Sequence, residues 1–343
     1  MSTPVSSWHP SGDLLRAARE RIKPFVHISP LLRAEPLDRP GFRVVLKAEN
    51  LQRTGSFKVR GAFNALAQLD PAAKAKGVVT FSSGNHGLAL GLAAFNLGWA
   101  ERGQPYPCTV VLPEDANPVK VKRVEAMGAQ VVFAGQSTED RKLKALEIAE
   151  ATGQTVIPSY DHPHIIAGQG TLGLEIMDQW MGLPARTRRL RLVAGPVGGG
   201  GLMSGTGAGL RARGFPGPLF GVEPDTANDT CLSMEKGERV GIPLSGTVCD
   251  GLRALTPGAI TFPILQRCEV QMRAVSEEQI KQAVVLLADE MKLIVEPSGA
   301  VAVAAWLAGL LEDFTQPPTE QADVVLILSG GNIDPSLLKG WIA

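Results

Sequence analysis

The amino-acid sequence predicts an α/β fold of open twisted sheets with helices on both faces. Two observations favour this fold. Short runs rich in valine, isoleucine and leucine alternate with longer helical segments along most of the 343 residues. Several of these runs lead directly into turns rich in glycine or serine, a common position for ligand contacts in such sheets. At this length, two domains or one large domain are expected.

The first half of the chain shows the alternation most regularly. Strands are predicted at residues 44–47, 78–81, 109–112, 130–133 and 155–158. Helices are predicted at 57–69, from the turn after residue 81 to Leu97, from Pro118 to about Gly128, and after a pattern resembling a capping box at Ser137 and Asp140. Residues 77–157 thus form a compact series, expected to be a small α/β domain inserted into a large domain of residues 1–76 and 158–343. A ligand is expected in the cleft between them.

The second half continues the alternation with longer gaps between elements. Strands are predicted at residues 190–194, 219–222 and 324–328. Helices are predicted from the glycine-rich turn after residue 194 to about Arg211, and from Ser276 to about Lys292. No internal repeat of fixed period interrupts this pattern, so one α/β architecture accounts for the whole chain.

The charge balance excludes several classes of partner. The chain has 34 Lys and Arg against 34 Asp and Glu, so it has no general attraction to nucleic acid or to an anionic membrane. The longest charge-free apolar run, Pro297–Leu311, is too short to span a membrane, and no signal peptide is recognisable. Four scattered cysteines without a Cys-x-x-Cys pair fit a reducing compartment. We therefore expect a cytoplasmic protein whose partner is a small molecule.

Glycine is the unusual feature of the composition, and its position indicates a phosphate site. There are 38 glycines, about 11% of the chain, against a usual value of about 7%. Eleven lie between Gly195 and Gly221, and four in succession, Gly198–Gly201, join a predicted strand to a predicted helix. Backbone N–H groups can close around an anion there, because glycine has no Cβ and a helix N-terminus adds positive charge. This stretch lacks a Gly-x-Gly-x-x-Gly register and a Gly-Lys dipeptide, so it suits a small monophosphate rather than a dinucleotide or ATP.

Three further motifs place polar groups near predicted strand ends or helix starts. In Thr54–Ala62, Lys58 begins a helix between two apolar residues, where a lowered pKa would make its amine nucleophilic. Phe81–Gly87 gathers hydroxyls, an amide and free N–H groups where a carboxylate could dock. Leu326–Asp334 places Ser329 at the carboxyl end of a buried strand. Taken singly, the first two motifs also fit a surface lysine and an ordinary capped turn.

The four motifs together resemble those of one enzyme family in order and approximate spacing. Residues 56–62 (Ser-Phe-Lys-Val-Arg-Gly-Ala), 82–87 (Ser-Ser-Gly-Asn-His-Gly), 198–201 (four glycines) and 329–332 (Ser-Gly-Gly-Asn) are similar to motifs of the fold-type II pyridoxal-phosphate enzymes, specifically the threonine dehydratase and serine racemase group. The resemblance covers nearly the whole chain, from about Ile28 to Asp334. It implies the two-domain fold of this group, which is like that of the tryptophan synthase β subunit, and a homodimer.

The resemblance implies a role for each motif. Lys58 would form the internal Schiff base with pyridoxal 5'-phosphate. Asn85 would bond the ring hydroxyl, and Ser329 would face the pyridine nitrogen. The phosphate would be held by Gly198, Gly199, Gly200 and Gly201 with the amide of Leu202, and the substrate carboxylate by Ser82, Ser83, Gly84, Asn85 and His86.

The implied activity is that of an ammonia-lyase. Lys58 would remove the α-proton of a 3-hydroxy amino acid, L-threonine or L-serine, and loss of the β-hydroxyl would give a 2-oxo acid and ammonia. Ser83 leaves a serine racemase open, because the racemases of this group are similar in having a serine there as a second acid–base group. Arg253 could recognise a second carboxylate, as in the related 3-hydroxyaspartate dehydratases. A protein that binds pyridoxal phosphate without catalysis is the alternative from another class.

A cation site is also implied by the resemblance, in the stretch from Gly221 to Asp229. Glu223, the carbonyl of Ala227 and Asp229 would supply hard oxygen ligands for Mg²⁺, Mn²⁺ or Ca²⁺, as in a similar stretch of the serine racemase group. An acidic surface turn is the other interpretation of this stretch.

Overall fold

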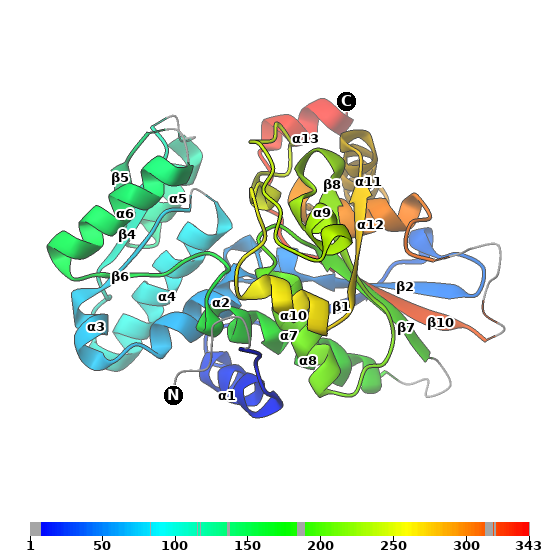
Figure 1. The fold of residues 1–343 in the computed structure, drawn as a ribbon, viewed down its shortest axis with the longest axis horizontal. Helices are drawn as coiled ribbons and strands as arrows, with labels where there is room; N and C mark the ends of the chain where they lie inside the picture. The colour runs from blue at the N-terminus through cyan, green and yellow to red at the C-terminus, as the bar shows by residue number, and fades with distance from the viewer. Residues whose placement is uncertain are drawn as a thin grey trace.

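The computed structural model describes residues 8–82, 84–114, 116, 118–135, 138–183, 189–312, 318 and 320–342. Two separate sheets organise them, one of six strands in the order β1-β2-β10-β7-β8-β9 and one of four in the order β5-β4-β3-β6. Figure 1 shows each sheet in its own lobe, with helices packed around it. The predicted α/β class is therefore confirmed.

The six-stranded sheet is parallel except at one edge. Its strands are β1 (Leu31–Arg33), β2 (Phe42–Ala48), β7 (Arg189–Pro196), β8 (Leu219–Pro224), β9 (Val270–Val275) and β10 (Ala322–Leu328). β1 runs antiparallel to β2, and the other neighbours pair in parallel. β10 lies between β2 and β7 and is buried along its whole length, as expected for an uninterrupted apolar run in a parallel sheet.

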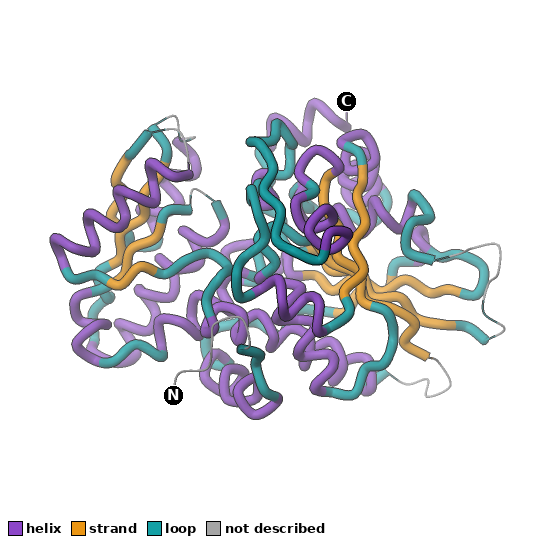
Figure 2. Tube along the Cα trace, viewed as in Figure 1, coloured by secondary structure: helices purple, strands orange, loops and turns teal. Residues whose placement is uncertain are grey.

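Alternate residues of β10 face two different helical layers. Val324 and Leu326 belong to a core cluster that includes residues of α11 (Glu277–Asp289) and α12 (Pro297–Leu307). Val325 and Ile327 belong to a second cluster with residues of α1 (Gly12–Ile22), α7 (Pro163–Met181), α8 (Gly201–Ala212) and α10 (Thr261–Arg267). Because successive strand residues point to opposite faces, the sheet has helices on both sides, and Figure 2 shows helices above and below its strands.

The four-stranded sheet is parallel throughout its described strands. They are β3 (Val78–Thr80), β4 (Cys108–Leu112), β5 (Gln130–Phe133) and β6 (Thr155–Val156). Helices α4 (Asn85–Arg102), α5 (Pro118–Ala126) and α6 (Thr138–Thr152) connect them. This sheet therefore lies within the segment expected to be an inserted unit. The strand expected at 155–158 is shorter than predicted, and its continuation is a single hydrogen bond from the Ile157 N–H to the Val79 carbonyl. Ser137 of the expected capping box lies outside the described residues.

Helix α2 (Lys58–Ala67) lies between the two lobes. Its residue Phe63 shares a core cluster with Leu90 of α4 and Ile165 of α7. The middle of α2 is therefore anchored to α4 and α7. Shorter helices complete the chain, namely α3 (Pro71–Lys76), α9 (Asp229–Lys236) and α13 (Pro335–Ile342), with 3-10 turns η2 (Glu35–Leu37), η3 (Glu49–Leu51), η4 (Arg53–Gly55), η5 (Asp225–Ala227) and η6 (Asp250–Leu252).

Part of the glycine excess is explained by helix packing. A Cβ on Gly209 of α8 would lie 2.3 Å from the carbonyl oxygen of Gly170 in α7. A Cβ on Gly173 of α7 would lie 2.2 Å from the carbonyl oxygen of Thr206 in α8. The two backbones approach too closely for any side chain at these positions. These glycines within α7 and α8 are explained by packing. The glycines of the turn before α8 remain the candidates for binding a ligand.

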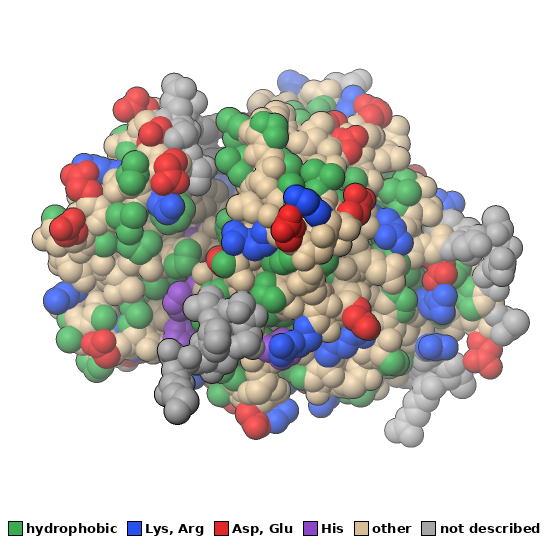
Figure 3. Space-filling view, viewed as in Figure 1, with side chains coloured by type: hydrophobic (Ala, Val, Ile, Leu, Met, Phe, Trp, Pro, Cys, Tyr) green, Lys and Arg blue, Asp and Glu red, His purple; other side chains and the backbone are tan. Residues whose placement is uncertain are grey.

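The charged side chains on the drawn face of the molecule are of mixed sign. On the face drawn in Figure 3, the Lys and Arg side chains are interspersed with Asp and Glu, without a single-sign field. None of the helices in the described ranges has the length and apolar character that a bilayer crossing requires.

Candidate active site

The predicted site residues follow the carboxyl ends of strands in both sheets. Lys58 begins α2 after the short turns that follow β2, the turn Gly198–Gly201 follows β7, and Ser329 follows β10. Since β2, β10 and β7 are neighbouring parallel strands, these residues meet at one edge of the large sheet. Asn85 begins α4, after β3 of the small sheet.

The Lys58 side chain is partly buried beside the segment that follows β6. Its Nζ donates a hydrogen bond to the carbonyl oxygen of Ser159 over 2.9 Å and lies 5.1 Å from the ring centroid of Phe57. Burial lowers the pKa of Lys58 to about 8, although the negative charge of Glu296 acts to raise it. Near neutral pH a larger fraction of this amine is uncharged than in an exposed lysine, which makes it a better nucleophile and base.

The turn before α4 carries the predicted carboxylate site. Ser82 and Gly84 are partly exposed, and Asn85 begins the helix directly after them. The first N–H groups of a helix have no acceptor within it and carry the positive end of the helix dipole, so this turn can receive an anion. Ser83 lies outside the described residues.

His86 is buried and uncharged. Burial, together with the charge of Lys58, lowers the pKa of His86 to about 3. Its Nε2 lies 3.2 Å from the carbonyl oxygen of Ile157, so we assign the proton of the neutral ring to Nε2. The His86 side chain is therefore not a cationic partner for a substrate carboxylate, and its backbone N–H is the group that remains for that task.

Glu296 joins the two lobes at the site and was not predicted from the sequence. Its carboxylate accepts a hydrogen bond from Asn85 Nδ2 over 2.7 Å, and its N–H donates to the Gly330 carbonyl over 3.0 Å. Asn85 Oδ1 accepts in turn from Asn332 Nδ2 over 2.7 Å. The amide of Asn85 is thus held at both ends. In the sequence, Glu296 stands directly before Pro297 at the start of an apolar stretch, and this position is the signal from which it could have been predicted.

Ser329 lies where it was predicted, at the end of β10, and is 3% exposed. Its carbonyl oxygen accepts a hydrogen bond from the N–H of Phe57 over 3.1 Å. The next residue, Gly330, forms an isolated antiparallel bridge with Ser56. These contacts bring the Ser329 turn against the segment that carries Lys58.

The turn Gly198–Gly201, here named the glycine cradle, has a backbone suited to binding an anion. Gly200 has a φ of +88°, a conformation that residues with a Cβ rarely adopt, and it is the N-cap of α8. A Cβ on Gly199 would lie 2.3 Å from the ring of Tyr160. On the other side, Thr261 Oγ1 donates to the carbonyl oxygen of Gly199 over 2.7 Å. The glycines of this turn have no side chains of their own that would cover the backbone N–H groups at the helix start.

Two buried carboxylates lie near the carboxyl end of β8, since Glu223 is the penultimate residue of that strand and Asp229 begins α9. Glu223 accepts hydrogen bonds from the N–H groups of Thr230 (3.2 Å) and Cys231 (2.9 Å). Burial and the charge of Asp229 raise the pKa of Glu223 to about 8, and burial raises the pKa of Asp229 to about 7. Within the described part of the chain, neither carboxylate oxygen of Asp229 has a hydrogen-bond partner. A cation would compensate these buried charges.

The residues between these carboxylates set limits on a cation site. Ala227 ends η5 and is buried. In the described ranges, no group of three His, Cys, Asp or Glu side chains is arranged so that it could hold a metal ion. A cation at this position would therefore need backbone carbonyl or water ligands besides Glu223 and Asp229.

Arg253 is exposed and bound within its own loop. Its Nε and Nη2 donate to the carbonyl oxygen of Thr247 over 3.1 and 2.6 Å. The turn η6 just before it passes close to the glycine cradle, because a Cβ on Gly198 would lie 3.1 Å from the carbonyl oxygen of Gly251. The loop that carries Arg253 therefore lies near the glycine cradle, but the guanidinium of Arg253 is bound to the carbonyl oxygen of Thr247.

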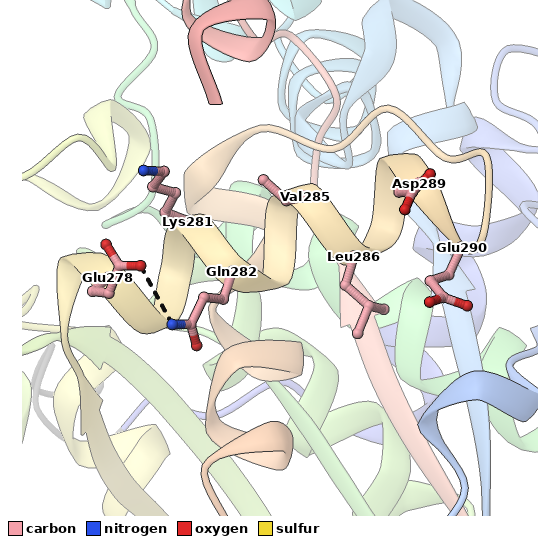
Figure 4. A pocket seen from close by; sticks show the side chains of 7 residues that line it. All are labelled: Glu278, Lys281, Gln282, Val285, Leu286, Asp289 and Glu290. Atoms are coloured by element: carbon pink, nitrogen blue, oxygen red, sulfur yellow. Dashed lines mark hydrogen bonds between the residues drawn. The ribbon is translucent and has the colours of Figure 1, made fainter. Parts of the chain in front are cut away.

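A surface pocket elsewhere contains none of the predicted site residues. It has a volume of about 310 Å³ and runs along α11. Figure 4 shows that its lining comes from one face of this helix, where Gln282 Nε2 donates to Glu278 Oε1 over 3.3 Å. Its lining consists of residues of α11 and the residue that follows this helix, so it is not part of the candidate active site.

The lysine, the glycine cradle and the serine at one sheet edge are features of a known family. Residues 22–330 match the family of pyridoxal-phosphate dependent enzymes, and the chain belongs to this family. It is 40% identical over 341 residues to an L-threo-3-hydroxyaspartate ammonia-lyase from Pseudomonas sp. The aligned region covers 98% of this chain and 99% of the relative.

Solved structures agree with this assignment. The structure of maize serine racemase has a TM-score of 0.87 at 32% identity and covers 97% of both chains. The processed form of threonine deaminase isoform 2 from Solanum lycopersicum has a TM-score of 0.84 at 33% identity and covers 97% of this chain and 89% of its own. The chain is thus a pyridoxal-phosphate dependent enzyme of the ammonia-lyase and serine racemase group, with a fold of type II.

Proposed function

We propose that the chain is an ammonia-lyase that converts L-threonine or L-serine into a 2-oxo acid and ammonia. One observation carries this proposal. The partly buried Lys58, whose pKa is lowered to about 8, lies at the same sheet edge as the glycine cradle and Ser329. A basic amine, a phosphate cradle and a neutral hydroxyl at one place are what a β-elimination on a 3-hydroxy amino acid requires of the protein.

The residues at this edge fit pyridoxal 5'-phosphate. The turn Gly198–Gly201 and the amide of Leu202 offer backbone N–H groups where side chains would clash, which suits the phosphate. Lys58 supplies the amine that binds the cofactor aldehyde, Asn85 an amide for the ring hydroxyl, and Ser329 a hydroxyl for the pyridine nitrogen. When bound, the cofactor supplies an electron sink for the charge that develops at the substrate α-carbon.

Lys58 is the group that moves the α-proton. Its neutral amine accepts a proton at Nζ, and the lowered pKa keeps a useful fraction of it neutral at physiological pH. The carbonyl of Ser159 accepts a hydrogen bond from the amine and orients it. Ser329 is uncharged and does not hold the pyridine nitrogen protonated as a carboxylate would, which favours prompt loss of the β-hydroxyl.

The start of α4 is the proposed site of the substrate carboxylate. Ser82 and Gly84 precede the helix and Asn85 and His86 begin it, so a hydroxyl and backbone N–H groups lie at the positive end of the helix dipole. Ser83, which lies outside the described residues, stays a predicted part of this site. The hydrogen bond between Asn85 and Glu296 ties this turn to the large sheet. It supports an active site in the cleft between a small domain of residues 77–157 and a large domain of residues 1–76 and 158–343.

We also propose a divalent cation, Mg²⁺, Mn²⁺ or Ca²⁺, bound by Glu223, the Ala227 carbonyl and Asp229. The buried Asp229 carboxylate supports it, because neither of its oxygens has a hydrogen-bond partner among the described residues. A homodimer and a cytoplasmic location remain predictions of the family resemblance and of the composition.

A 3-hydroxyaspartate ammonia-lyase is the second candidate, favoured by the Pseudomonas relative of that name. The side chain of that substrate carries a second carboxylate. Arg253 is the proposed partner for this carboxylate, which would replace the Thr247 carbonyl as its hydrogen-bond acceptor. Serine racemisation is a third outcome, for which Ser83 would be the second acid–base group.

A substrate panel tests the proposal. L-Threonine, L-serine, D-serine and L-threo-3-hydroxyaspartate are each followed for 2-oxo acid formation and for exchange of enantiomers. The proposal is supported if L-threonine is converted into 2-oxobutanoate and has the highest kcat/KM of the four substrates, or a kcat/KM equalled only by that of L-serine. Preference for hydroxyaspartate assigns the second candidate, and exchange without 2-oxo acid assigns a racemase. A protein that binds the cofactor and converts none of the four contradicts the enzyme assignment.

A further inference from the structure

Three consecutive residues before α7, Ser159–Asp161, contact both halves of the proposed cofactor site. The carbonyl of Ser159 accepts the hydrogen bond from Lys58 Nζ. The ring of Tyr160 packs against the glycine cradle, 2.3 Å from the position of a Cβ on Gly199. The side chain of Asp161 points to a third segment, at the start of α10, which lies beside the start of α7 in Figure 1.

The Asp161 carboxylate binds three successive backbone N–H groups. Its Oδ2 accepts from Ala259 over 2.9 Å, and its Oδ1 accepts from Ile260 over 2.8 Å and from Thr261 over 3.2 Å. The contact is close, since a Cβ on Gly258 would lie 2.3 Å from Asp161 Oδ1. Hydrogen bonds to a charged acceptor are stronger than neutral ones, so this carboxylate fixes the backbone of residues 258–261.

The fixed segment in turn holds one peptide group of the glycine cradle. Thr261 Oγ1 donates to the Gly199 carbonyl over 2.7 Å, and the N–H of Gly258 donates to the same oxygen over 3.3 Å. In a trans peptide the carbonyl and the following N–H point in opposite directions. The N–H of Gly200 is therefore directed away from Thr261, on the side of the cradle that Thr261 leaves open.

We propose that Asp161 is a positioning residue for the phosphate group of the cofactor. It fixes residues 258–261, Thr261 then holds the Gly199 carbonyl, and the N–H of Gly200 is thereby presented to a phosphate monoester. The inference rests on the proposed role of the glycine turn. Because Asp161 acts through the cradle, its removal weakens the phosphate contact and leaves the bond to the aldehyde largely intact.

The test compares two ligands that differ only in the phosphate. The full chain, stripped of cofactor, is titrated with pyridoxal phosphate and with pyridoxal, and the ratio of the two affinities is measured. Asp161→Ala should lower this ratio by about tenfold or more, because hydrogen bonds to a charged group are lost. Asp161→Asn, which keeps one acceptor oxygen, should give an intermediate ratio. An unchanged ratio in Asp161→Ala, with both ligands weakened equally, overturns the inference.

Two further variants keep the result interpretable. Thr261→Val removes the hydroxyl that holds the Gly199 carbonyl and should also lower the ratio, which covers the case in which Asp161→Ala does not fold. Asp70→Ala removes a comparable contact far from the site, where Asp70 Oδ1 accepts from the N–H of Ala73 over 2.9 Å, and should leave the ratio unchanged. A lowered ratio in Asp70→Ala, or an unchanged one in Thr261→Val, contradicts the inference. A wild-type protein without preference for pyridoxal phosphate overturns the proposed role of the glycine turn itself.

Discussion

A buried ion cluster beneath α2 makes a quantitative prediction. Arg60 is 1% exposed, and its guanidinium donates to both carboxylate oxygens of Glu49 over 2.8 Å and to both of Glu175 over 3.0 Å. Lys47 Nζ donates to Glu175 over 2.6 Å. The cluster therefore balances two positive against two negative charges. It connects the start of α2, two residues after Lys58, to β2, η3 and α7.

Replacing Arg60 by methionine breaks this balance. Two carboxylates are then left with one ammonium group, and removal of one partner of a buried ion pair costs about 3–5 kcal/mol. We predict that Arg60→Met lowers the free energy of unfolding by about that amount. Adding Glu49→Gln restores the balance, so the double variant should be more stable than the single one by about 1 kcal/mol or more.

Urea unfolding at a fixed cofactor concentration, followed by circular dichroism and by tryptophan fluorescence, measures these differences. Arg16→Met is the matched control, because Arg16 pairs with Asp13 on the surface and should lose about 1 kcal/mol or less. An Arg60→Met variant that loses no more stability than Arg16→Met would contradict the role of the buried cluster. A double variant less stable than Arg60→Met alone would contradict it too.

Three other outcomes are expected. In protein stripped of cofactor, Glu296→Gln keeps an acceptor for Asn85 but removes the negative charge that raises the pKa of Lys58. That pKa should therefore fall below about 8, as measured by the pH dependence of acylation of the amine. Gly199→Ala should weaken pyridoxal phosphate binding about tenfold, since the new Cβ meets the neighbouring ring and overpacking costs about 1–3 kcal/mol. In protein treated with a chelator, Mg²⁺ at about one hundred times its dissociation constant should add about 2.7 kcal/mol of stability, and Glu223→Gln should abolish this gain.

Each of these outcomes has a control or a contrary result. A pKa of Lys58 that stays the same or rises in Glu296→Gln would contradict the electrostatic account of this amine. Gly246→Ala, where an added Cβ meets no atom within 4 Å, should leave cofactor affinity unchanged and is the control for Gly199→Ala. A gain in stability from Mg²⁺ that survives in Glu223→Gln would place the cation elsewhere.

Elements with a strong local signal were predicted well. The apolar run at 324–328 lies inside β10, because a short stretch of branched residues bounded by polar ones is the signature of a buried strand. The helix expected from Ser276 is α11, and both hydrogen bonds of its capping box with Gln279 are present. In these cases the residues that form the structure are neighbours in the chain.

Helix α7 was missed for a physical reason. It runs from Pro163 to Met181 and is buried on most of its surface, so it lacks the polar face that reveals a helical period. Its glycines, which pack against α8, weaken the local propensity further.

The positioning residues of the site were missed for another reason. Glu296 lies 211 residues from Asn85, and Asp161 lies about 100 residues from the N–H groups that it binds. Their roles arise only from the sheet order that brings these segments together. The motif residues could be predicted from the resemblance, whereas the side chains that hold the motifs in place could not.

The central claim is that the amine of Lys58 carries the cofactor next to the glycine cradle. Borohydride makes the bond between a lysine amine and the cofactor aldehyde permanent, and peptide mass spectrometry then locates it. We expect one pyridoxyl phosphate group per chain, on the peptide that contains Lys58. A label on any other lysine, or none on protein that binds the cofactor, would contradict it.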